Sequence, residues 1–240
     1  MNKRTFVKSV LLGVAGVYAS GLAARAMRTR TKWDGVFKMP ELPFSLDSLE
    51  PFIDADTLKL HLQHHSTYTE KLNSAVSLAG LRGKSAYELM RMASEYPPEI
   101  RNLAGGYLNH KLYWRILHPQ GKAPSDEFNR VIQRDFGSLE NLSTEFTKVA
   151  AGVSGPGWVW LITDCKGKLK ITSTSDHDNP VMDVTPERGF PLLCLDVWDH
   201  AYPSKNQNRR SDYINSFGKF INWEVVSRRY RSASKIDFKI

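Results

Sequence analysis

Residues 191–202 constrain the fold of this chain most, because an apolar strand ends there in a carboxylate and an imidazole follows four residues later. Residues 191–195 are apolar and come soon after Gly189, which is typical of a buried strand. Asp196 and His200 then offer an oxygen and a nitrogen to one point, as first-row metal sites require. Taken alone, such a pair is more often a surface aspartate and an ordinary turn histidine. A metal site therefore needs further ligands from other segments.

A helical segment expected over residues 54–76 supplies one such ligand, His61. Asp54 is a candidate N-cap for this helix. At about 100° per residue, three more ring-bearing side chains share the face of His61. They are His64, His65 and Tyr68.

A second helical segment, expected over residues 97–118, supplies His110. Two prolines at its start are typical of a helix N-terminus. Gly105 and Gly106 lie inside it and cost about 2 kcal/mol of helix propensity relative to two alanines. The pair therefore predicts that another group packs closely against this helix.

The remaining pattern predicts an α+β fold. A capping box at residues 85–88 starts one short helix, and helices are expected after Ser125 and Gly137. The period then changes to two, which predicts an antiparallel three-stranded sheet from residues 158–163, 169–174 and 191–197. One amphipathic helix is expected over residues 210–230. We expect an N-terminal helical hairpin domain at 38–120, a C-terminal α/β domain with the sheet flanked by helices at 121–232, and a tail at 233–240.

Residues 1–26 indicate a cleavable targeting segment, followed by a basic linker at 27–37. The segment has a basic start, an apolar run over residues 10–24 and an A-x-A-like site at its end. The run is short and only moderately hydrophobic, so no stable membrane insertion is expected after its removal. Residues 2–8 resemble a twin-arginine signal with Lys3 in place of the first arginine, which favours export to the periplasm. A mitochondrial transit peptide is the alternative, because the segment has no acidic residue.

The positive charge lies mainly in this leader and linker. The formal net charge is +8, and removing the four positive charges of residues 1–26 leaves +4. Three further cations lie in the linker, at Arg28, Arg30 and Lys32. The folded part is therefore close to neutral, and we expect no nucleic-acid partner.

The two cysteines are too few for a disulfide framework. Cys194 lies in the expected buried strand, where it acts as a small apolar residue, and Cys165 lies in a hairpin turn. Whether the two form a disulfide stays open.

These segments together resemble the iron/manganese superoxide dismutase family over about residues 38–232. The matching pieces occur in the family's order. They are Leu42-Pro43-Phe44, Leu49-Glu50-Pro51, the helix from His61 to Tyr68, Asn109-His110 with Tyr113-Trp114, Gly157–Leu161, and Asp196–Tyr202.

The resemblance implies a superoxide dismutase that converts superoxide to dioxygen and hydrogen peroxide, an antioxidant reaction. It implies one Fe or Mn ion per chain and a homodimer. The implied metal ligands are His61, His110, Asp196 and His200.

The resemblance also implies catalytic roles for Tyr68, His64 and His177. Small Gly106 leaves room that we expect the side chain of His177 to fill beside the metal. A histidine at the position of His177 also occurs in iron-using members, so we expect iron. Four tryptophans are expected to surround the centre, namely Trp114, Trp158, Trp160 and Trp198.

The chain departs from the family pattern at several positions. The helix is one residue shorter between His61 and Tyr68, so either the tyrosine approaches at a new angle or the helix kinks. Pro203 replaces a tyrosine, and Asp199 replaces a glutamate, both of which make contacts between subunits in the family. Gln207 stands where an arginine is common, and we expect the neighbouring Arg209 and Arg210 to attract the anionic substrate instead.

Two alternatives to the enzyme remain at this point. One is a catalytically impaired structural protein with this fold, of the type found in mitochondrial ribosomes, which would have no need of all four ligands. The other is a metal site for different oxygen chemistry, which requires more open coordination positions than these ligands leave. The complete ligand set favours the dismutase.

Overall fold

The computed structural model describes residues 36–202 and 209–233. The expected leader at 1–26, most of the linker, Pro203, Gln207 and the tail beyond residue 233 lie outside the described residues. The helices are α1 (Ala55–Leu78), α2 (Ala86–Arg91), α3 (Pro98–Ile116), α4 (Asp126–Phe136), α5 (Leu139–Gly152), α6 (Arg209–Ser216) and α7 (Trp223–Ala233). The strands are β1 (Gly157–Thr163), β2 (Leu169–Ser175) and β3 (Phe190–Asp196), and the short 3-10 helices are η1 (Ala93–Glu95), η2 (Asp199–Ala201) and η3 (Phe217–Phe220).

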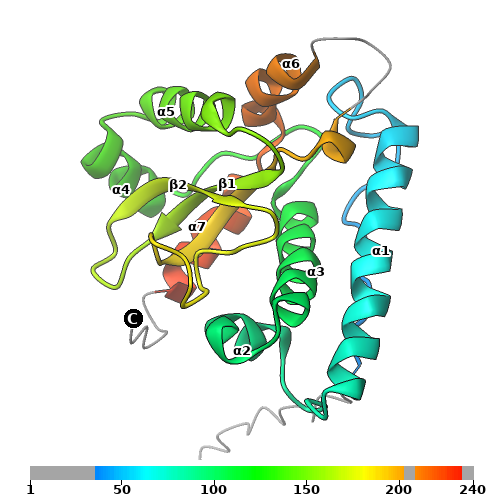
Figure 1. Ribbon diagram of the computed structural model, residues 1–240. Helices are drawn as coiled ribbons and strands as arrows, with labels where there is room; N and C mark the ends of the chain where they lie inside the picture. The colour runs from blue at the N-terminus through cyan, green and yellow to red at the C-terminus, as the bar shows by residue number, and fades with distance from the viewer. Residues whose placement is uncertain (1–35, 203–208, 234–240) are drawn as a thin grey trace, which may run out of the picture. The chain divides into compact units, whose positions relative to one another are not determined.

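The N-terminal half is a hairpin of α1 and α3, which lie side by side and run in opposite directions (Figure 1). The Asp54 side chain caps α1 by accepting a hydrogen bond from the Thr57 N–H at 2.8 Å. The buried side chains of α1 recur every three or four residues, so one stripe faces α3. They are Leu58, His61, His65, Thr69, Leu72 and Val76.

The C-terminal half contains the expected antiparallel sheet in the order β2-β1-β3. Every residue of central β1 is buried, since α5 packs against β1 and β2 while α3 and α7 pack against β3. The register pairs Trp158 with Asp196. The last residue of β3 therefore lies next to an indole of the central strand, at the end of the sheet that adjoins η2.

The expected single helix over residues 210–230 is wrong. The chain forms α6, η3 and α7 instead, with a break at Ile221 and Asn222. There the backbone pairs with the segment after α3: the Asn222 N–H donates to the Ile116 carbonyl at 2.7 Å, and the Lys122 N–H donates to the Ile221 carbonyl at 2.9 Å. These long-range hydrogen bonds replace the intrahelical ones that a continuous helix would make.

The structure also bears on the two cysteines and on membrane insertion. Both Cys165 and Cys194 are free thiols, the first exposed and the second buried. Among the described residues, no helix combines the length and apolar character that crossing a lipid bilayer requires.

Candidate metal centre

Four side chains from four elements converge at one point. His61 comes from α1, His110 from α3, Asp196 from the end of β3 and His200 from η2, and their ligand atoms all lie within 4.8 Å of one another. The Oδ2 atom of Asp196 lies 3.0 Å from Nε2 of His61 and 3.5 Å from Nε2 of both His110 and His200. The first three residues are fully buried and His200 is nearly so. The geometry thus brings together the expected ligand set.

The protonation of these groups fits a metal ion. The Nδ1–H of His110 donates to the Gly106 carbonyl at 2.6 Å, which leaves the Nε2 lone pair directed at the carboxylate. Nε2 of His110 and of His200 is buried and has no hydrogen-bond partner among the described residues. A lone pair facing a carboxylate oxygen at 3.5 Å repels it unless a cation lies between them.

Electrostatics points the same way. Burial lowers the pKa of His61 and holds that of His110 well below its ordinary value, so both imidazoles are neutral. Burial also opposes ionisation of Asp196, but hydrogen bonding within the histidine cluster, such as that from His61, outweighs it and keeps its pKa low. Neutral imidazole nitrogens around an ionised carboxylate are the donor set that iron or manganese binds.

Backbone contacts orient the carboxylate. Oδ1 of Asp196 accepts a hydrogen bond from the Trp198 N–H at 2.9 Å, and this turns Oδ2 toward the histidines. His200 follows on η2 rather than on an α-helical turn, because Trp198 is extended directly before the short 3-10 helix begins. The strand end and the turn act together as one rigid ligand pair.

His65 supports the centre without being a ligand. Its Nδ1 accepts a hydrogen bond from Trp114 Nε1 at 3.0 Å, and its Nε2–H donates to the Tyr107 carbonyl at 3.1 Å. Trp114 packs edge-on against the His61 ring at 4.6 Å, so His65 positions a wall of the site. Sequence reasoning placed His65 on this face but gave it no role. The available signal was its position one helical turn after His61.

His177 lies beside the centre with one nitrogen free. Trp158 Nε1 donates to its Nδ1 at 3.2 Å, while Nε2 has no partner among the described residues. Its ring stacks on Trp198 at 4.6 Å and meets the Tyr68 ring edge-on at 4.4 Å. Burial lowers its pKa to about 4, so the ring is neutral and carries its proton on Nε2.

Polar contacts hold the loop that carries His177. The Asn109 amide on α3 donates to the His177 carbonyl at 3.1 Å and accepts from the Asn179 amide at 2.8 Å. Arg101 forms a two-pronged ion pair with Asp178 in the same loop. Side chains of α3 therefore fix the position of His177 beside the metal centre.

The space beside Gly106 in α3 is filled by the Tyr68 ring and not, as expected, by the side chain of His177. A Cβ at Gly106 would lie 2.7 Å from the Tyr68 ring, whereas a Cβ at Gly105 would collide with the His177 backbone carbonyl. Close packing against this helix is thus found, but Tyr68 rather than the His177 side chain occupies the space at Gly106. A ring on the facing helix α1 reaches that space more directly than a side chain from a loop.

The shorter spacing between His61 and Tyr68 lies within one continuous helix, α1. It runs unbroken from Ala55 to Leu78, and His61 and Tyr68, seven residues apart, lie two turns apart on one face. The Tyr68 ring lies 5.7 Å from the His110 ring, and burial raises the pKa of its hydroxyl. His64 is half-buried and stacks on His200 at 4.3 Å. Tyr68 and His64, to which the family resemblance gives catalytic roles, therefore both lie against metal ligands.

Other expected residues have these positions. Trp158 packs edge-on against His110 at 5.1 Å, and Trp160 stacks behind Trp158 at 5.9 Å. Asp199 accepts a hydrogen bond from the Tyr202 hydroxyl at 2.7 Å. The Arg210 side chain donates a hydrogen bond to the Val153 carbonyl at 2.7 Å, directly after the end of α5.

The comparisons with known proteins agree with this geometry. Residues 36–118 match the alpha-hairpin domain of iron/manganese superoxide dismutases, and residues 124–229 match their C-terminal domain. Among curated relatives, "Superoxide dismutase [Mn]" of Acinetobacter baylyi is 41% identical over 203 residues, covering 83% of this chain and 89% of the relative. The same-named protein of Thermus aquaticus is 42% identical over 205 residues, covering 82% and 98%. Because both domains match in order around an assembled ligand cluster, the chain belongs to the iron/manganese superoxide dismutase family.

Proposed function

We propose that this superoxide dismutase binds one iron or manganese ion through His61, His110, Asp196 and His200, and that superoxide is converted there to dioxygen and hydrogen peroxide. The observation that carries the proposal is the convergence of three Nε2 atoms on one carboxylate oxygen. Two of them, those of His110 and His200, are buried and have no hydrogen-bond partner among the described residues. A structural protein would gain nothing from such an arrangement, because unsatisfied buried polar atoms are destabilising.

An iron or manganese ion held there supplies the alternating one-electron oxidation and reduction that the reaction requires. The protein must deliver two protons for each hydrogen peroxide. We assign this role to the neighbourhood of Tyr68 and His177, which hold protons on the hydroxyl and on Nε2. The tryptophans around the ligands exclude bulk water, and His64 covers His200 on the more exposed side.

The identity of the ion depends on these neighbouring groups. The four ligands are the same for either metal, whereas hydrogen-bond donors beside the centre shift its reduction potential. His177 at its position favours iron, while the relatives are named manganese enzymes. Elemental analysis of protein produced with both metals in excess decides between them.

The test is metal content and superoxide disproportionation measured on the same sample, without residues 1–26. We expect about one iron or manganese ion per chain and rapid turnover. His110→Ala should lose metal and activity together, whereas His118→Ala, a histidine outside the centre, should lose neither. His110→Ala protein with full metal content would contradict the ligand assignment.

A second variant separates the binding of the metal from the adjustment of its reduction potential. His177→Ala removes the unpartnered Nε2 but none of the four ligands. We expect full metal content with a shifted reduction potential and slower turnover. An unchanged reduction potential would show that His177 does not influence the metal.

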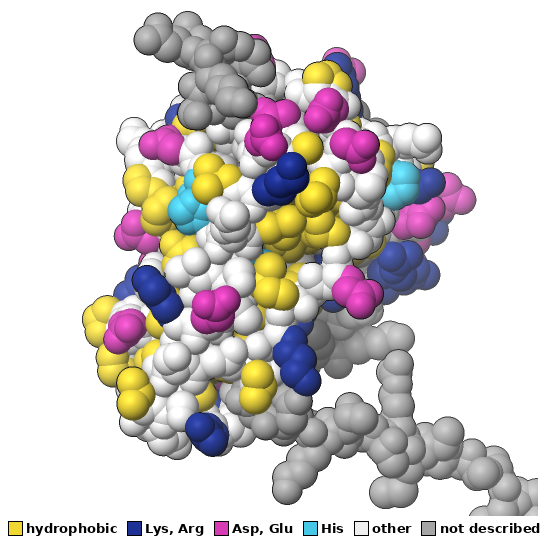
Figure 2. Space-filling model, turned by 90° about the vertical axis from the view of Figure 1, so that its right-hand side faces the viewer, with side chains coloured by type: hydrophobic (Ala, Val, Ile, Leu, Met, Phe, Trp, Pro, Cys, Tyr) yellow, Lys and Arg dark blue, Asp and Glu magenta, His cyan; other side chains and the backbone are white. Residues whose placement is uncertain are grey.

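We also propose a homodimer. The face that includes α1 carries apolar side chains gathered among scattered charges (Figure 2), as expected of a surface that another subunit covers. Light scattering of the purified protein tests this, and a monomer at micromolar concentration would contradict it.

We further propose that the chain is exported to the periplasm with cleavage near residue 26. The support is that the family match begins only at residue 36, after the acid-free basic and apolar leader. Mass spectrometry of the mature protein from the periplasmic fraction should show the shortened chain. An intact leader in a cytoplasmic fraction would contradict export.

A further inference from the structure

A cavity lies on the face of α3 that points away from the metal centre. It has a volume of about 340 Å³ and is lined by residues from α2, α3, the loop before β3, the start of β3 and α7. On α3 the lining residues include Leu108, Leu112 and Arg115, which lie roughly opposite His110 around the helix axis. None of the four metal ligands lines this cavity, so it is a separate feature of the molecule.

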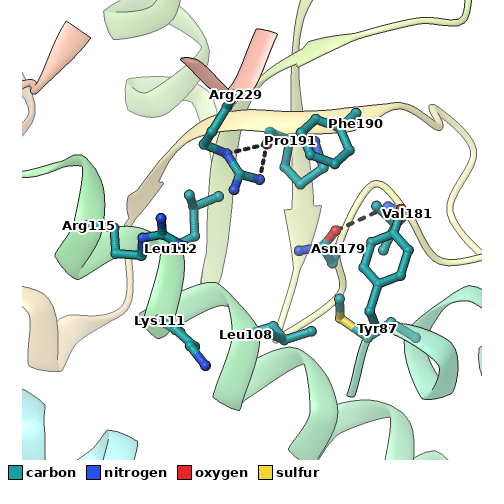
Figure 3. Close-up of a pocket in the computed structure, with 11 residues that line it drawn as sticks. Tyr87, Leu108, Lys111, Leu112, Arg115, Asn179, Val181, Phe190, Pro191 and Arg229 are labelled. Carbon is teal, nitrogen blue, oxygen red and sulfur yellow. Dashed lines mark hydrogen bonds between the residues drawn. The ribbon is translucent and has the colours of Figure 1, made fainter. Parts of the chain in front are cut away.

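The lining carries positive charge but no acidic residue. Lys111, Arg115 and Arg229 contribute three cations, and Figure 3 shows the guanidinium groups of the two arginines on the same side of the cavity. Among the described residues, no carboxylate lies within salt-bridge distance of any of the three. The proximity of Arg115 also disfavours the charged form of Arg229.

Arg229 is the most unusual of these cations, because its guanidinium is buried. Its Nε and Nη2 donate to the Pro191 carbonyl at 3.0 and 2.5 Å, and the group lies 4.8 Å from the centre of the Phe190 ring. Burial, and then the neighbouring Arg115, lowers its pKa to about 10. A neutral carbonyl and a ring face leave most of the charge uncompensated, whereas buried charges are normally paired.

The Tyr87 hydroxyl is a buried group in the lining whose hydrogen-bonding capacity is not used. It has no hydrogen-bond partner among the described residues, although the oxygen is shielded from solvent. Its ring stands along the wall of the cavity across from the arginines (Figure 3). A buried hydroxyl without an acceptor and a buried guanidinium whose charge no carboxylate compensates indicate that an anionic, acceptor-bearing molecule enters between them.

Apart from Asn179, the rest of the lining is apolar, including Met90, Leu108, Leu112 and Val181. Inorganic anions gain nothing from such walls, but a hydrocarbon or aromatic body does. The volume also lies in the range of small-molecule sites. We propose that this cavity binds a small organic anion with an apolar body, whose anionic head lies between Arg115 and Arg229 and accepts a hydrogen bond from Tyr87.

The test is calorimetric titration of the metal-loaded enzyme with octanoate, octanamide and inorganic phosphate. We expect saturable binding of octanoate to one site per chain. The neutral octanamide should bind at least tenfold more weakly, because it lacks the charge, and phosphate should do the same, because it lacks the apolar body. Equal binding of octanoate and octanamide would overturn the role of the cations. Equal binding of octanoate and phosphate would overturn the role of the apolar walls.

Two variants locate the site without endangering the fold. Tyr87→Phe removes only a hydroxyl with no partner, and Arg115→Gln changes an exposed side chain. Each should weaken octanoate binding about tenfold, the usual effect of losing one hydrogen bond or ion contact to a charged group, and each should keep full metal content and dismutase activity. Arg82→Gln, an exposed arginine bonded to Ser77, serves as the matched control and should bind octanoate normally. Unchanged binding by both Tyr87→Phe and Arg115→Gln would place any octanoate elsewhere and overturn the proposal.

Discussion

At the scale of single residues, the centre depends on contacts that orient its ligands and neighbours. The Gly106 carbonyl fixes the tautomer of His110, while its missing side chain admits the Tyr68 ring. Gly106 thus both orients the metal ligand His110 and makes room for Tyr68. The backbone of α3 approaches α1 closely here, which explains why a residue of low helix propensity, glycine, occupies position 106.

Gly106→Ala should slow turnover while leaving the metal bound. Its Cβ would lie 2.7 Å from the Tyr68 ring, so the ring must move away from His110 and His177. We expect at least a fivefold loss of activity with unchanged metal content, since a displacement of about 1 Å can cost 10²-fold in rate. Gly152→Ala is the matched control: it also lies in a helix, and nothing lies within 4 Å of its added Cβ. Equal activity of the two variants would contradict the close contact with Tyr68.

His65 should make the protein sensitive to acid. Burial lowers its pKa to about 4 in the folded state, against about 6.5 in the unfolded chain. Between these values the unfolded state binds more protons, so the free energy of unfolding falls as the pH decreases from 6.5 to 4, by about 3 kcal/mol from this group. His65→Gln should flatten that dependence in urea unfolding at matched metal loading. His118→Gln should keep the wild-type slope, and a wild-type slope in His65→Gln would show that other groups carry the acid sensitivity.

At the scale of elements, caps and long-range backbone pairing decide where helices end. Helices α2, α4 and α5 begin after serine side chains that accept N-terminal hydrogen bonds, as their sequences indicate. The break between α6 and α7 has a different origin. There Asn222 both pairs with Ile116 through its N–H and caps α7, with Oδ1 accepting from the Val225 N–H at 3.3 Å.

Asn222→Ala should destabilise the fold by about 1 kcal/mol, the usual cost of losing an N-cap. The measurement is urea unfolding of the metal-loaded protein. Asn215→Ala, at an exposed position inside α6, should change stability by no more than about 0.5 kcal/mol, because alanine favours helix there. Similar losses in the two variants would argue against a specific cap at residue 222.

At the scale of the whole molecule, the metal centre joins the helical hairpin to the sheet. Its ligands come from α1, α3, β3 and η2, which belong to both halves of the chain. A bound ion therefore stabilises contacts between segments that are far apart in sequence. It binds only the folded state, in which the four ligands are together.

Removal of the metal should lower the melting temperature by about 10 °C. Binding at 1,000 times the dissociation constant contributes about 4 kcal/mol, and about 2–4 °C follows from each kcal/mol at this chain length. Calorimetry of the enzyme before and after chelation measures the shift. His110→Ala protein should show no such shift, and an equal shift in both proteins would mean that chelation acts elsewhere.

Much of this architecture follows from local sequence. The caps at Asp54 and Ser85, the apolar run of β1 and the spacing of His61 and Tyr68 each depend on residues close together in the sequence. The strand ending at Asp196 is local in the same sense. The α+β order and the four ligands could therefore be predicted, the ligands with the help of the family resemblance.

Other features depend on segments brought together only by folding. The break at Asn222, the ring of Tyr68 over Gly106 and the tie between Arg210 and α5 are contacts across long stretches of chain. The sequence by itself determined the three strands and most of the helices, because neighbouring residues set caps, turns and periodicity. Only the tertiary structure decided which side chain fills each space and which cations have no carboxylate beside them, because packing depends on residues that no local pattern connects.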